Sequence, residues 1–93
     1  MTTRKTLIVA KYGVLELELK KYIGAELFPS LDSIDVVDLV YLITMMFVGV
    51  ETEAQYAAKI RELMDANGVA VDGPTFDVVA PLISGFVAWL KLL

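Results

Sequence analysis

The sequence predicts a mainly α-helical, compact single domain over residues 1–93, with helices at about 31–48, 52–67 and 75–92 and an N-terminal β-hairpin at about 5–20. Apolar residues at three- and four-residue spacing, bounded by capping residues and glycines, predict the three helices. Strict alternation near the N-terminus predicts the hairpin. No linker interrupts these patterns, and a chain of 93 residues suits one hydrophobic core.

The N-terminal segment leaves two alternatives open. Apolar and charged residues alternate within Val14–Lys20, which is typical of a half-buried strand, and Thr6–Ala10 is rich in β-branched residues. Between them, Lys11-Tyr12-Gly13 offers a short connection. The alternative is an all-α, four-helix fold, in which one long helix has the apolar stripe Ile8, Tyr12, Leu15, Leu19 and Tyr22. We expect the hairpin, because a helix would scatter the charges of this segment around its axis.

The helix at 31–48 is predicted from its first turns. Ser30 can cap it, and the acids Asp32, Asp35 and Asp38 are favourable near the positive end of a helix dipole. Its second half, Leu39–Val48, is apolar on every side, which predicts burial all round, either at the centre of the domain or under another chain. Gly49 then ends the helix.

The last two helices carry clearer end signals. Thr52 and Gln55 have the spacing of a capping box, and Asn67-Gly68 ends the stripe Tyr56, Ala57, Ile60, Leu63 and Met64. The segment Asp72-Gly73-Pro74-Thr75 supplies turn and cap residues before the last helix. Pro81 lies inside that helix and removes a backbone donor, so we expect a kink or a restart there.

Charge and composition exclude several classes of function. The chain is acidic, with a net charge of −4, so it lacks the basic surface that binds nucleic acid. Residues 1–21 hold five cations and two acids, whereas residues 22–77 hold ten acids and two cations, a polarity of +3 against −8 that could orient copies head to tail. The longest uncharged runs, Leu39–Val50 and Val78–Leu90, fall short of the about 18–20 residues that span a bilayer. With no signal peptide visible, we expect a cytoplasmic protein without a transmembrane span.

The residue types also argue against catalysis. The chain has no histidine and no cysteine, which removes the commonest general base and the usual zinc ligands. Ser33 and Ser84 have no evident base to activate them. Asp32, Asp35 and Asp38 could offer oxygen ligands to Mg²⁺ or Ca²⁺, but three-residue steps spread them over about 120° of a helix surface. We therefore expect no enzyme activity, no metal and no cofactor.

One short segment suggests a different class of protein. Asp32-Ser33-Ile34-Asp35 resembles the segment that begins the second helix of acyl carrier proteins. The resemblance implies that Ser33 would carry a phosphopantetheine arm and that Asp32, Asp35 and Asp38 would face the transferase. A solvated, capped helix start explains the same residues.

An apolar surplus is the main functional signal. Hydrophobic residues make up 57% of the chain, against about 45–50% in typical domains, and a chain this short buries only part of its surface. We expect the surplus to form a core plus a partner-binding surface for a second copy or a hydrophobic helical partner. The predicted partner-binding residues are Met45, Met46, Phe47, Phe86, Trp89, Leu90 and Leu93. A membrane-surface role is a further alternative, although the acidic charge predicts little binding to anionic lipid.

The order of predicted elements, the size and the acidity resemble those of small tail-assembly proteins of long-tailed bacteriophages. Members of that family chaperone the hydrophobic, helical tape-measure protein and deliver it to tail-tube subunits. The resemblance implies a viral assembly protein in the host cytoplasm whose exposed apolar helices bind the client, and it transfers no individual site residue.

Overall fold

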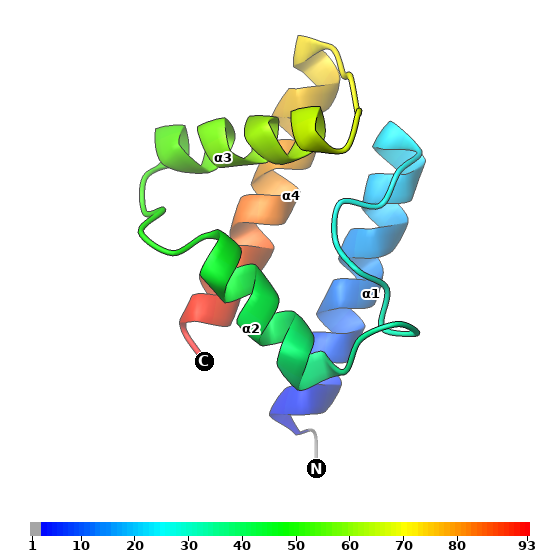
Figure 1. Ribbon diagram of the computed structural model, residues 1–93, viewed down its shortest axis with the longest axis vertical. Coiled ribbons are helices and arrows are strands. Elements are labelled where there is room, and N and C mark those ends of the chain that lie inside the picture. Colours follow the sequence, from blue (N-terminus) through cyan, green and yellow to red (C-terminus); the bar gives the residue numbers. More distant parts are fainter. Residues whose placement is uncertain (1–2) are drawn as a thin grey trace.

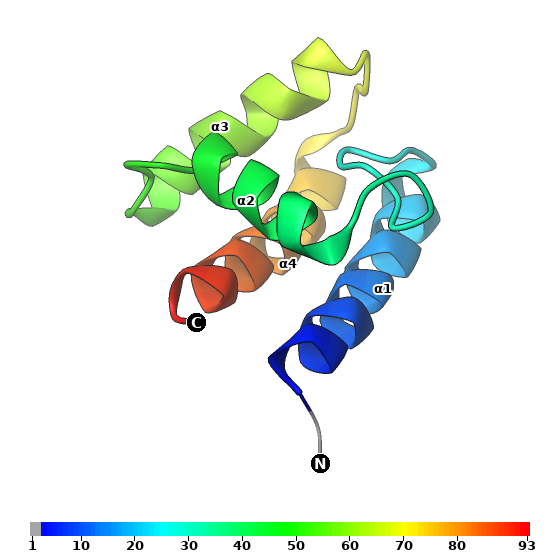
Figure 2. The same cartoon turned by 60° about the horizontal axis from the view of Figure 1, so that its bottom comes forward.

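The computed structural model describes residues 3–93, which form four α-helices and, over that range, no strand (Figure 1). The helices are α1 (Arg4–Ile23), α2 (Val36–Met46), α3 (Glu53–Ala66) and α4 (Gly73–Lys91). α1 and α4 lie side by side and run in opposite directions, α2 packs across both, and α3 packs across α4 (Figures 1 and 2). α4 is the only described helix that contacts all three others, so it is the centre of the fold.

The predicted β-hairpin at 5–20 is wrong, and the four-helix alternative is confirmed. Thr3 caps α1 by accepting a hydrogen bond from the backbone of Thr6, and Gly24 ends it in the left-handed conformation with φ of 63°. Ile8, Tyr12, Leu15 and Leu19 are buried along one face, whereas Tyr22 is exposed. The alternation of apolar residues suggested a strand with Leu15, Leu17 and Leu19 on one buried face. Leu17 is instead 70% exposed, because it lies on the outer side of a helix.

α2 begins later than predicted. Residues 31–34 form a separate turn, in which Ser30 accepts the backbone N–H of Asp32 at its hydroxyl and those of Ser33 and Ile34 at its carbonyl. Ser30 therefore caps this turn, and Asp35 is the residue before the first helical residue, Val36. Burial all round within the domain is also wrong, because Tyr41 and Met45 are 67% and 51% exposed, and cover by another chain stays a prediction.

The predictions for the last two helices are confirmed, with one correction. Thr52 and Gln55 form the capping box of α3, and Tyr56, Ile60 and Met64 are buried. α4 starts behind Asp72, whose side chain accepts the backbone N–H of Thr75. The helix neither ends nor restarts at Pro81. Pro81 and Asp77, the residue whose carbonyl loses its partner, both lie on the exposed side, where water can replace the missing hydrogen bond.

The core is apolar throughout the described residues. No polar or charged residue between 3 and 93 is fully buried, and no buried side-chain N or O atom there lacks a hydrogen bond. Tyr12 contributes its ring to the core and donates its hydroxyl hydrogen to the carbonyl of Pro29, which ties the α1–α2 connection to α1. Burial, reinforced by the nearby Glu16 and Glu26 carboxylates, raises the pKa of Tyr12 far above its ordinary value, so the hydroxyl keeps its proton at neutral pH.

Candidate interaction surfaces

The seven predicted partner-binding residues fall into three groups. Phe47, Phe86 and Leu90 are buried in the core, and of these three Phe86 also lines the groove between α1 and α4 that is described next. Met46 and Trp89 are half-buried, and Met45 and Leu93 are exposed. The division follows helix geometry, because residues adjacent in sequence point about 100° apart. The predicted surplus on α2 and α4 is thus shared between core and surface.

An open, mostly apolar groove lies between α1 and α4, and we call it the α1/α4 groove. Its volume is about 480 Å³. Val14 and Leu15 from α1 and Leu82 and Trp89 from α4 form its walls, and Ala10, Pro81 and Gly85 leave room between them. A side-chain carbon placed on Gly85 would meet no other atom within 4 Å, so the groove is open at this point.

Three aromatic rings pack against one another at the α1/α4 groove. Phe86 lies between Tyr12 and Trp89, with ring centroids 5.7 Å and 6.1 Å away. The ammonium of Lys11 lies 5.0 Å from the centre of the Trp89 ring, which is within cation–π distance. These contacts join α1 to α4 and fix the position of Trp89, so the groove belongs to the packed fold.

Two charged residues of α1, Lys11 and Glu18, also line the α1/α4 groove. They lie two turns apart on the same side of the helix. Within residues 3–93 the single ion pair joins Lys59 to Glu62, at 3.6 Å on α3. Neither Lys11 nor Glu18 is therefore engaged by an opposite charge within the described chain.

A second apolar surface follows the outer side of α2 and the turn after it, and we call it the α2 stripe. It consists of Val37, Tyr41, Met45 and Val48, which recur every three or four residues and are all more than half exposed. None of these residues lines the α1/α4 groove. The molecule therefore presents apolar helix surface in two separate places.

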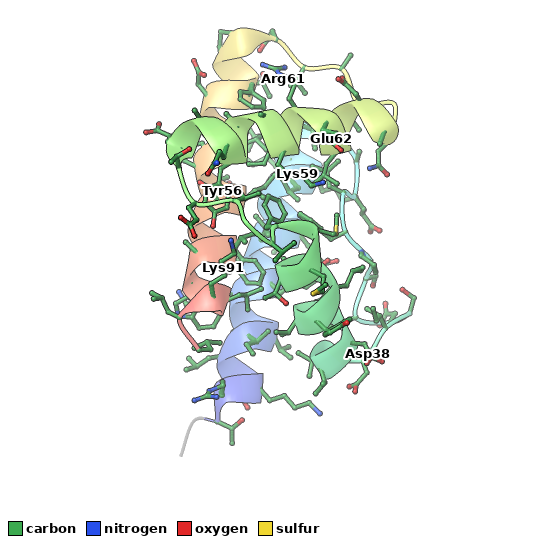
Figure 3. All side chains as sticks on the ribbon, turned by 60° about the vertical axis from the view of Figure 1, so that its left-hand side comes forward. Asp38, Tyr56, Lys59, Arg61, Glu62 and Lys91 are labelled. Carbon is green, nitrogen blue, oxygen red and sulfur yellow. The ribbon has the colours of Figure 1, made fainter. Side chains whose placement is uncertain are left out.

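Sequence reasoning missed the role of Lys91. Its ammonium donates hydrogen bonds to the carbonyls of Phe47 and Val50, both at 2.7 Å, and lies 5.4 Å from the centre of the Tyr56 ring. Figure 3 shows Lys91 on α4 beside Tyr56 at the start of α3. Carbonyls at a helix C-terminus lack partners and carry partial negative charge, so a cation is favourable there. Position 91 gave no signal because its partners lie more than 40 residues away in the sequence.

The polar motifs do not converge on a catalytic or metal site in the described chain. Asp32, Asp35 and Asp38 are all exposed, and no three acidic side chains among residues 3–93 gather into a cation site. Ser84 donates to the carbonyl of Pro81 on its own helix. Ser33 is exposed and donates to the carbonyl of Ser30, at 2.9 Å, at the end of the segment that joins α1 to α2.

α4 is long and apolar enough to cross a membrane by length and composition. That property is weak evidence, because the core helix of a soluble protein passes the same test, and six residues of α4 are buried in this core. Comparisons with protein-family models, curated proteins and solved structures give no match to this chain. The arguments about function therefore rest on the surfaces themselves.

Proposed function

We propose that this protein is a non-catalytic interaction and assembly protein that associates, through exposed apolar helix surface, with a second copy of itself or with a hydrophobic helical partner. The α1/α4 groove carries the proposal. It is open, mostly apolar and bounded by two helices, which is the shape into which the apolar side of a third helix packs.

Three features support this function. Val14 and Leu82 in the groove are exposed to water, and burying their apolar surface under a partner would be favourable. Trp89 is held in place by its neighbours, and such aromatic side chains contribute strongly at interfaces. The α2 stripe adds a separate apolar surface, so the chain could contact two partners at once, as an assembly protein does.

The test uses Gly85 to block the groove. Gly85→Leu adds a side chain where the fold leaves space, and it replaces a helix-destabilising glycine. Ala58→Leu is the matched control, because it enlarges an exposed residue on α3, which does not line the groove. Self-association is followed by sedimentation velocity, and partner binding by the anisotropy of a labelled helical peptide with one leucine face.

We expect Gly85→Leu to weaken association, with itself or with the peptide, at least about tenfold, and Ala58→Leu to change it little. Circular dichroism confirms that both variants remain folded. A wild-type protein that binds neither itself nor the peptide contradicts the proposal. Equal association by the two variants contradicts the assignment to the groove.

The phage tail-assembly resemblance offers a specific hydrophobic partner, the helical tape-measure protein, for the same surfaces. Part of that resemblance rested on an N-terminal hairpin, which α1 replaces. The size, the acidity and the exposed apolar helix surface remain, so we keep phage assembly as the proposed context. Direct binding of a tape-measure segment, blocked by Gly85→Leu, is the corresponding test.

A carrier role at Ser33 is the second candidate. It is favoured by the position of Ser33, which is exposed and lies three residues before α2, at the end of segment 24–35. Incubation with a phosphopantetheinyl transferase and coenzyme A, followed by intact-mass measurement, decides the question. A gain of one phosphopantetheine group that Ser33→Ala abolishes supports the carrier role, and an unchanged mass rejects it.

A further inference from the structure

We infer that the α1/α4 groove is the interface of a symmetric homodimer in which the α1 helices of two copies pack antiparallel, with reciprocal Lys11–Glu18 ion pairs. The inference rests on the proposed function, since it names one partner of the groove and its orientation. The partner is a second copy of this chain.

The exposed side of α1 has the pattern of a helix-pairing seam. Leu7, Ala10, Val14 and Leu17 recur at alternating three- and four-residue steps and are all exposed. This is the spacing of the two apolar positions in a coiled-coil heptad. The core of the monomer uses a different face of α1, that of Ile8, Tyr12, Leu15 and Leu19, so no described residue of the chain covers the seam.

The charges beside this seam in one copy are complementary to the same charges in a second copy. Lys11 and Glu18 lie seven residues apart, about 10 Å along the helix, and the midpoint between them falls between Val14 and Leu15. A two-fold axis at that midpoint, with the helices antiparallel, places Lys11 of each copy level with Glu18 of the other. Both ion pairs then form, one on each side of the axis.

Other arrangements lose this complementarity. A parallel pair in register would place Lys11 against Lys11 and Glu18 against Glu18, which is unfavourable. A two-fold interface needs a surface that is complementary to its own copy, and a reciprocal pair of opposite charges meets that requirement. Val14 lies nearest the axis and Leu7 lies level with Tyr22 of the second copy, all three being exposed in the monomer.

Charge reversal tests both the dimer and its direction. Lys11→Glu gives two like-charged Glu pairs and Glu18→Lys gives two like-charged Lys pairs, so each variant alone should dissociate about tenfold or more readily than the wild type. The double variant exchanges the charges and should recover the dimer. An equimolar mixture of the two single variants should also recover it, because each heterodimer then contains two opposite-charge pairs.

Sedimentation equilibrium at low salt measures these dissociation constants, and circular dichroism checks that every variant is folded. Lys59→Glu on α3, away from the groove, is the matched control for Lys11→Glu because it makes the same change of net charge. Glu62→Lys on the same helix is the matched control for Glu18→Lys, and both controls should leave the dimer unaffected. Recovery by the double variant and by the mixture supports the antiparallel register.

The failures are distinguishable. The inference is overturned if the single charge reversals leave the dissociation constant of the dimer unchanged. It is also overturned if the two single variants do not form a heterodimer when mixed. Either result leaves the proposed function standing. A monomeric wild type that still binds the leucine-faced peptide through the groove also overturns the inference and leaves the proposed function standing. A wild type that neither dimerises nor binds the peptide overturns both.

Discussion

Replacing Lys91 by methionine should destabilise the whole domain, although the side chain lies at the surface. Lys91 is the last residue of α4, and its ammonium reaches the carbonyls of Phe47 and Val50 just after α2. Methionine keeps most of the aliphatic stem, so the change removes the charge and its hydrogen bonds while preserving most of the packing.

The expected loss follows from two hydrogen bonds of 2.7 Å from a cation to carbonyl oxygens. Bonds to charged groups contribute about 1.5–3 kcal/mol each when buried, and solvent reduces that value at an exposed site. We take about 1 kcal/mol for each bond, so Lys91→Met should lower the free energy of unfolding by about 2 kcal/mol. For a domain of this size, that loss is a large fraction of the total stability.

Urea unfolding followed by far-UV circular dichroism measures this change. Lys59→Met is the control, because its single ion pair with Glu62 is a surface pair worth about 0.5 kcal/mol or less. Hydrogen exchange should also become faster at the amide of Val50, which bonds to the carbonyl of Phe47. A Lys91→Met protein within about 0.3 kcal/mol of the wild type would refute the reasoning.

Three further changes test other parts of the fold. Tyr12→Phe removes the hydroxyl that bonds to Pro29, so thermal unfolding should show a loss of about 1 kcal/mol, and an unchanged transition would contradict that role. Thr52→Ala breaks the capping box of α3 and should cost about 1 kcal/mol by urea unfolding, whereas Thr52→Ser should cost much less. Burial and the nearby Glu26 and Asp32 raise the pKa of Glu16, so the native state holds its proton more readily and stability falls as pH rises through that pKa. Glu16→Gln should therefore be more stable than the wild type at pH 7 but not below the ordinary carboxyl pKa of 4.5, and a gain that persists in acid would point to another cause.

The sequence predicted α3 and α4 well because their signals are local. A capping box needs only Thr52 and Gln55, and a buried helical stripe repeats within one segment. It misjudged the N-terminus because Leu15, Leu17 and Leu19 alternate like a strand over a short window. Over the longer window from Ile8 to Leu19, the apolar residues recur at the three- and four-residue steps that form the core face of α1. Tertiary packing of that face offsets the loss of helix stability caused by Gly13.

The candidate surfaces were only partly predictable for a related reason. Composition shows that apolar area exceeds what the core can hold, but it does not tell which of two neighbouring residues faces inwards. Met45 is exposed, while Phe47, two positions later, is completely buried. The α1/α4 groove was missed because its walls come from opposite ends of the chain, and half of it lies on a segment that was expected to form strands.

The packing of α4 sharpens the explanation of the apolar surplus. Its inner side supplies Val79, Ile83 and Val87, which are completely buried. Its outer side supplies Leu82 and Trp89 to the α1/α4 groove. Withdrawing α4 from this fold would remove the one described helix that contacts the other three and would expose the core. The apolar composition of α4 is thus divided between the core on its inner side and the α1/α4 groove, the proposed partner site, on its outer side.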